Sequence, residues 1–119
     1  MTVVPLPSRS DFDAVFENPD AKLGHQDFLV LARKNTGNGD LCRIGFVTSK
    51  KKIKRAVDRN RFRRVFRETL RTSESLLGID YVVVARRLPG ALHSSLFASD
   101  LKRCFEKLAK TLEKKHVGS

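Results

Sequence analysis

Half of the residues between positions 50 and 71 are lysine or arginine, and their side chains are the clearest candidates for chemistry in this chain. The segment holds eleven basic and two acidic residues, so it carries +9 of the net charge of +11 of the whole chain. A surface of fixed positive charge repels itself and is stabilised by a polyanion. Guanidinium groups stay charged at cellular pH and can grip phosphate oxygens in pairs. The segment therefore predicts a binding site for nucleic acid.

Side chains that could form a protein active site are scattered by comparison. His25, His93 and His116 fall in expected loops or ends, without a carboxylate at metal-ligand spacing. The chain has no glycine-rich phosphate loop and no CxxC pair, and Ser94-Ser95 fits a helix cap better than a nucleophile. Asp58 could reach a metal ion near RNA phosphates, but it also fits the favourable acidic position in the first turn of a helix. We expect no catalytic side chain, no metal and no cofactor on this chain alone.

The arginines need a helix to present them, and the sequence predicts one over Arg55–Thr72. An apolar stripe at helical spacing would face the core: Phe62, Val65, Phe66, Thr69 and Leu70. At about 100° per residue, the opposite side presents Asn60, Arg63, Arg64, Arg67 and Arg71. Like charges four residues apart oppose helix formation, so the helix must be held by the packing of its stripe.

Two further helices are predicted on either side of this one. A helix over Arg9–Glu17, capped by Ser8, would place Phe12, Val15 and Phe16 on one face. A last helix would run from Ser94 or Ser95 to Lys115. An aromatic pair such as Phe12 and Phe16 most often belongs to a core, so the residues alone leave core and binding surface both open.

Three strands are expected between the helices. Phe28–Ala32 and Cys42–Thr48 flank a turn at Asn35–Asp40 and would form an antiparallel hairpin. Ile79–Ala85 is the most β-branched run in the chain and predicts a central strand. The order of elements predicts an α+β protein, a two-layer α/β sandwich in a single domain over residues 1–119.

Composition also indicates a compartment. No apolar run is long enough to span a membrane, and the first residues lack the pattern of a signal peptide. Cys42 and Cys104 lie among apolar residues, which predicts buried free thiols. Together these features favour the cytoplasm, and we expect no membrane partner.

The basic helix resembles the signature of the bacterial ribonuclease P protein family. The matching blocks are Lys50-Lys51-Lys52, Ala56, Arg59-Asn60-Arg61, Arg63-Arg64 and Arg67-Glu68. Three further blocks of that family are matched by Asp11–Phe16, Arg43–Lys51 and Asp80–Arg86, so the resemblance covers about residues 6 to 112. Two positions depart from it, because Lys54 stands where many members carry glycine and Leu31 where some carry an aromatic residue.

The resemblance implies a fold and a function. The fold would be like the second domain of ribosomal protein S5, with a left-handed β-α-β crossover through the basic helix, a rare exception to the right-handed rule. The family is the protein subunit of a ribonucleoprotein that removes the 5′ leader from precursor tRNA. Its catalytic RNA subunit performs the hydrolysis with Mg²⁺, and the protein binds that RNA and the leader.

The resemblance also implies site residues. With Arg55 and Arg71 from the same helix, the expected RNA contacts are Lys51, Lys52, Arg59, Asn60, Arg61, Arg63, Arg64 and Arg67. A cleft for the single-stranded leader would be lined by Phe12, Phe16 and Tyr81, although Tyr81 could instead anchor its hydroxyl at the edge of the sheet.

Composition alone leaves two other functions open. A ribosomal or ribosome-associated RNA-binding protein would also be small and basic, and only the signature separates it from the first hypothesis. A protein that inserts the arginine helix into the major groove of DNA is the third. The many arginines favour phosphate contacts over base contacts, and no helix-turn precedes the helix, so we expect no DNA partner.

Overall fold

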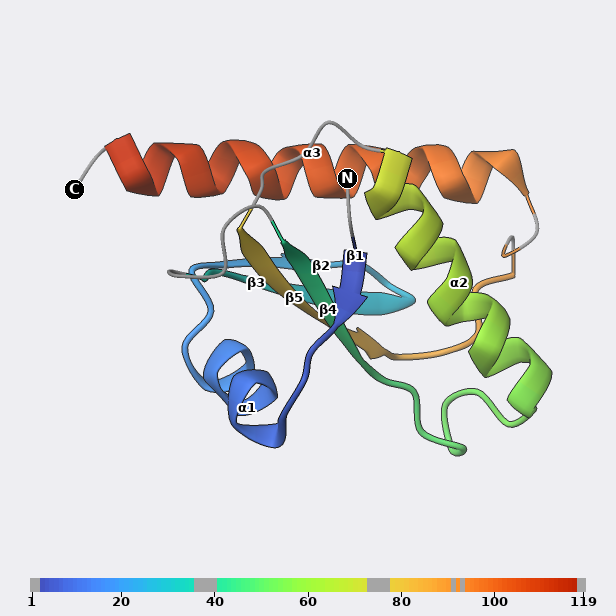
Figure 1. Ribbon diagram of the computed structural model, residues 1–119. Helices are drawn as coiled ribbons and strands as arrows, with labels where there is room; N and C mark the ends of the chain where they lie inside the picture. Colours follow the sequence, from blue (N-terminus) through green and yellow to red (C-terminus); the bar gives the residue numbers. More distant parts are fainter. Residues whose placement is uncertain (1–2, 36–40, 73–77, 91, 93, 118–119) are drawn as a thin grey trace.

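The computed structural model describes residues 3–35, 41–72, 78–90, 92 and 94–117 (Figure 1). In chain order the elements are β1 Val3–Pro5, α1 Arg9–Glu17, β2 Ala21–Gly24, β3 Phe28–Lys34, β4 Cys42–Val47, α2 Ala56–Thr72, β5 Ile79–Ala85 and α3 Ser95–Val117. All the predicted helices and strands are confirmed, with bounds within two residues of those expected. The short strands β1 and β2 were not predicted. Of the turn expected at Asn35–Asp40, residues 36–40 lie outside the described residues, as does His93.

The five strands form one sheet in the order β1-β4-β5-β3-β2. The predicted hairpin between β3 and β4 is wrong, because β5 lies between them, antiparallel to β3 and parallel to β4. The strand richest in β-branched residues thus takes the centre of the sheet, where both of its edges are paired. The connection from β4 through α2 to β5 joins neighbouring parallel strands, which is the crossover that the resemblance implies. Its left hand stays a prediction.

The main core lies between one face of the sheet and the helices α2 and α3. Phe66 of α2 is its hub, with ring centroids 5.1 Å from Phe28, 6.3 Å from Phe97 and 6.3 Å from Phe105. All three pairs meet edge to face, the arrangement that aromatic rings prefer in cores. The predicted apolar stripe of α2 is confirmed, since its members are buried or packed against this core.

The helix α1 lies on the opposite face of the sheet (Figure 1). Val15 of α1 is fully buried against Leu31 and Val82. Ser8 caps this helix as predicted: its hydroxyl accepts the Asp11 N–H at 3.2 Å and donates to the Asp11 carboxylate at 2.7 Å. The sandwich is therefore confirmed, with α1 covering part of the second face.

None of the helices in the described ranges combines the length and the apolar character needed to cross a bilayer.

Candidate functional site

The basic segment begins with a loop that the protein itself braces. Ser49 accepts main-chain hydrogen bonds from Lys52 and Ile53 through its carbonyl, at 3.1 and 3.0 Å, and Ile53 is buried. The guanidinium of Arg59 donates to the carbonyls of Ile53 and Lys54, at 2.9 and 2.8 Å. Arg59 therefore fixes the entry to α2, so this predicted RNA contact also has a structural role.

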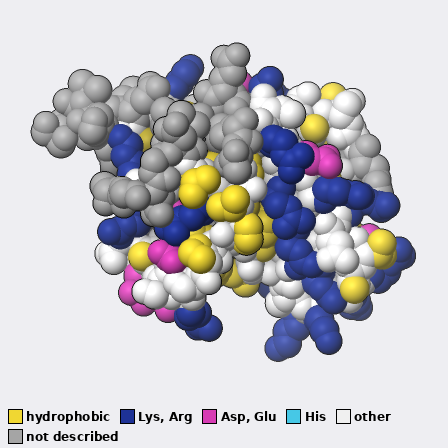
Figure 2. Space-filling model, in the orientation of Figure 1, with side chains coloured by type: hydrophobic (Ala, Val, Ile, Leu, Met, Phe, Trp, Pro, Cys, Tyr) yellow, Lys and Arg dark blue, Asp and Glu magenta, His cyan; other side chains and the backbone are white. Residues whose placement is uncertain are grey.

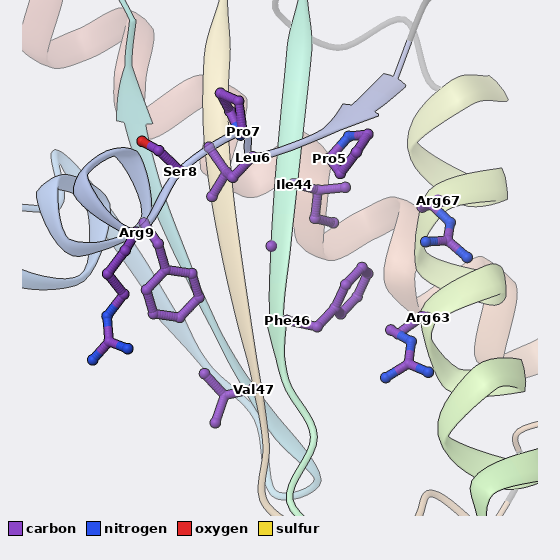
Figure 3. Close-up of a pocket in the computed structure, with 12 residues that line it drawn as sticks. Pro5, Leu6, Pro7, Ser8, Arg9, Ile44, Phe46, Val47, Arg63 and Arg67 are labelled. Atoms are coloured by element: carbon purple, nitrogen blue, oxygen red, sulfur yellow. The ribbon is translucent and has the colours of Figure 1, made fainter.

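Arg63 and Arg67 point from α2 toward β4 (Figure 3). Arg63 donates to the Thr48 hydroxyl at 2.9 Å and to the side-chain oxygen of Asn60. The guanidinium carbon of Arg67 lies 6.0 Å from the centre of the Phe46 ring, a cation–π contact. These partners are all neutral, so both guanidinium groups are oriented without their charge being cancelled. The side chain of Asn60 therefore holds a neighbouring arginine.

The other predicted RNA contacts belong to α2 and to the loop before it. Arg61 and Arg64 line a second groove, of about 580 Å³, between α2 and the start of α3. Arg55 lies 3.4 Å from Asp58, so the acidic residue of the first turn has a basic partner inside the protein. Lys51, Lys52 and Arg71 are exposed. Figure 2 shows that Lys and Arg side chains gather where α2 lies, beside a band of hydrophobic side chains.

That hydrophobic band borders a groove of about 760 Å³ between α1, β4 and α2 (Figure 3). Its lining residues come from the end of β1 and the segment that follows it, from the start of α1, from β4 and from α2: Pro5, Leu6, Pro7, Ser8, Arg9, Phe12, Ile44, Gly45, Phe46, Val47, Arg63 and Arg67. A Cβ at Gly45 would lie 2.9 Å from Leu6 Cδ1 and 3.1 Å from Phe12 Cδ2. The floor of the groove therefore needs a residue without a side chain where Leu6 and Phe12 pack against β4.

The three aromatic residues predicted for a cleft are not all at this groove. Phe12 lines it, and the exposed ring of Phe16 stacks on Phe12 with centroids 6.1 Å apart and planes at 14°. Tyr81 is fully buried and packs edge to face on Phe105, on the other face of the sheet. The placement of Tyr81 in the cleft is therefore wrong, because its side chain alternates with those that face α1.

A buried ion pair beneath α1 was not predicted. Arg43 of β4 donates to both carboxylate oxygens of Asp80 on β5, at 2.7 and 2.6 Å, and the two residues are 8% and 5% exposed. Asn35 donates to the same carboxylate at 2.7 Å. These hydrogen bonds raise the pKa of Arg43. The sequence did hold a signal, since each charge stands inside an otherwise apolar strand and a buried charge needs a partner.

Arginines from the sheet hold α1 at both ends. Arg43 reaches the Asp11 carboxylate at 3.3 Å, in the first turn of α1. Arg33 of β3 donates to the carbonyls of Ala14 and Asn18, at 3.3 and 3.1 Å, where α1 ends. The Ser8 hydroxyl, and then Arg43, lower the pKa of Asp11. The wall of the groove is thus fixed to the sheet by residues that do not line it.

Cysteine and histidine side chains outside these two grooves pack within the fold. Cys42 is a buried free thiol as predicted, and burial raises its pKa to about 12. Cys104 is a free thiol but is only partly buried, which corrects the prediction for this residue, and desolvation raises its pKa as well. His25 accepts the Asp27 N–H at 3.0 Å through Nδ1 and stacks on Phe28, with centroids 4.3 Å apart. Among the residues that the structure describes, no group of three or more His, Cys, Asp or Glu side chains is arranged to hold a metal ion.

The comparisons with known proteins agree with this geometry. Residues 3–109 match the family model for ribonuclease P. The chain is 38% identical over 115 residues to the ribonuclease P protein component of Chromohalobacter salexigens, across 96% of this chain and 88% of that relative. Its fold is similar to the solved ribonuclease P proteins of Staphylococcus aureus and Thermotoga maritima. The comparison with the Staphylococcus aureus protein has a TM-score of 0.69 at 25% identity and covers 91% of this chain and 96% of that one. The comparison with the Thermotoga maritima protein has a TM-score of 0.65 at 28% identity and covers 89% of this chain and 96% of that one. The matched region includes α2, the groove and the buried ion pair.

Proposed function

This chain belongs to the ribonuclease P protein family, whose role is the maturation of tRNA 5′ ends, and on that premise we propose how its residues serve that activity. The arginine side of α2 and the lysine loop before it bind the catalytic RNA subunit. The groove between α1, β4 and α2 holds the single-stranded 5′ leader of precursor tRNA. The RNA subunit hydrolyses the phosphodiester bond, and no side chain of this chain takes part in that chemistry.

The observation that carries the proposal is a pair of arginines, oriented by neutral groups, beside an apolar groove. Arg63 and Arg67 are held in place by a hydroxyl, an amide oxygen and an aromatic ring. None of these partners neutralises a guanidinium group, so the helix keeps a positive potential toward the groove. A single strand of RNA offers what this surface lacks, phosphates for the arginines and bases for the apolar wall.

The apolar wall fits a strand of variable sequence. Phe12 and Phe16 stack on each other, and half of the Phe16 side chain is exposed to solvent. Every base has a flat face that can stack on an aromatic ring, and such stacking contributes about 1–3 kcal/mol per base. The groove would therefore bind leaders without a strong sequence preference. Leu31 is buried beneath α1, so the first long strand adds no stacking surface.

Family membership favours this role over a ribosomal one. For this chain we propose the cytoplasm as its compartment and the RNA subunit and precursor tRNA as its partners. In the assembled enzyme, Mg²⁺ would be held by phosphates of the RNA, as the family resemblance implies, and Asp58 would keep its pairing with Arg55.

The decisive experiment mixes the full chain with candidate ribonuclease P RNA subunits and follows leader removal at low Mg²⁺ concentration. Cleavage that requires both components supports the proposal. Cleavage by the polypeptide without RNA would overturn it. Binding should also weaken with salt, and about six phosphate contacts imply a log–log slope of about −4 to −5.

Two sets of variants separate the surfaces. Arg64→Ala with Arg71→Ala should weaken assembly with the RNA subunit, whereas Lys102→Ala with Arg103→Ala removes the same charge from α3 and should not. Phe16→Ala should weaken binding of the leader-bearing precursor more than binding of mature tRNA. Equal effects on both RNAs would contradict the assignment of the leader to the groove.

A further inference from the structure

We propose that the main chain of Phe46, at the open edge of β4, hydrogen-bonds to the Watson–Crick edge of one unpaired base of the bound RNA strand. The inference rests on the proposed function of the groove. It adds a contact that can form with an unpaired base and cannot form with a paired one. Because the contact is made by main-chain atoms, it could not be predicted from the residue types in the sequence.

The edge of β4 is only half covered. On one side β4 pairs with β5 from Arg43 to Val47. On the other side β1 pairs only with Cys42, Arg43 and Ile44. After β1 the chain turns away toward α1, which begins at Arg9 (Figure 3).

The alternation of the strand sets the direction of the main-chain groups of Phe46. Leu6 donates its N–H to the Ile44 carbonyl at 3.1 Å, so the main-chain groups of Ile44 point to the β1 side. Main-chain groups of successive strand residues alternate between the two neighbouring strands. Those of Phe46 therefore point to the same side as those of Ile44, and no described strand lies opposite them. An edge of this kind is a ready template for another chain.

The surroundings favour RNA over a peptide strand as the occupant. Arg63 and Arg67 line the groove on one side of this edge, and Phe12 lines it on the other. A strand with a phosphate at each nucleotide suits the two guanidinium groups, whereas an uncharged peptide leaves them unpaired. Phe46 itself lines the groove and turns its ring toward α2, beneath Arg67 (Figure 3).

The chemistry of the contact explains both its tolerance and its selectivity. Each of the four RNA bases has a donor beside an acceptor on its Watson–Crick edge, and an N–H with a C=O from one strand residue complements that pair. The contact can therefore accept any base. A base inside a duplex has this edge occupied, so the contact requires a single strand.

The test uses modified precursor tRNAs with the enzyme assembled from the full chain and its RNA subunit. Each leader uridine is replaced in turn by N3-methyluridine, which blocks the Watson–Crick edge, or by 5-methyluridine, which leaves that edge free. At one leader position N3-methyluridine should weaken binding about five- to tenfold, the effect of a lost hydrogen-bond pair, and 5-methyluridine should not. The loss should vanish when the RNA subunit binds the precursor without the protein.

Three results would overturn the inference, and they have different meanings. If an abasic nucleotide weakens binding but N3-methyluridine does not at any position, the base only stacks and the groove still holds the leader. If the effect of N3-methyluridine persists without the protein, the RNA subunit makes the contact. If precursors with and without a leader bind equally well, the proposed function of the groove fails as well.

Discussion

Replacing Arg43 by methionine should cost far more stability than the loss of any exposed arginine. The change keeps most of the side-chain volume but removes both hydrogen bonds to Asp80, which is 5% exposed. Asn35 would remain as a partner of that carboxylate, yet its amide carries no charge. Breaking a buried pair from one side typically costs about 3–5 kcal/mol, because the remaining charge is left without a counter-charge. We therefore expect a loss of about 3 kcal/mol in the free energy of unfolding.

Urea unfolding followed by circular dichroism measures this loss directly. The matched control is Arg103→Met, because Arg103 forms an exposed pair with Asp100 on α3, and such a pair contributes about 1 kcal/mol or less. The double change Arg43→Met with Asp80→Leu should recover part of the stability, since two apolar residues can replace a buried pair. A loss below about 1 kcal/mol for Arg43→Met alone would refute the view that this pair fixes the sheet beneath α1.

Three further predictions concern single positions. Gly45→Ala should push the Phe12 ring away and weaken precursor binding several-fold in a fluorescence assay, whereas Gly24→Ala, with open space around its Cβ, should not. Equal behaviour of the two variants would contradict the close approach of α1. Cys42 should be alkylated at pH 8 roughly a hundredfold more slowly in the native protein than in urea, because burial raises its pKa to about 12; similar rates by mass spectrometry would show that it is accessible. The pKa of Asp11 is lowered by folding, so its carboxylate stabilises the protein above its unfolded pKa, and this contribution is lost as the pH falls through the lower folded value. Asp11→Asn should therefore flatten the loss of stability below about pH 4, and an unchanged acid unfolding curve would contradict this.

Periodicity was enough to predict the helices and the side of α2 that faces solvent. The apolar residues of α2 recur at helical spacing, so its buried stripe follows from the sequence alone. The sheet order did not follow, because the turn predicted from the residues between β3 and β4 suggests that these two strands pair, whereas β5, far along the chain, lies between them. The short strands β1 and β2 have too few residues to show a period.

The positive charge of the candidate site could be predicted from the sequence, but the complete set of residues that line the groove could not. Except for Asp80, β5 is apolar throughout, so alternation cannot tell which side chains face α1. Tyr81 was assigned to the wrong face for this reason. The structural role of Arg59 depends on the path of the loop before α2, which no spacing rule describes.

The attachment of α1 at both ends has a consequence for turnover. Because Arg43 and Arg33 fix this helix before any ligand arrives, binding carries no entropic cost of ordering it. Calorimetry with a leader oligonucleotide should then show a heat-capacity change set by contact area alone, without a contribution from coupled folding. In the proposed function, a rigid wall would also let the cleaved leader depart without any rearrangement, which would suit a subunit that must be ready for the next substrate.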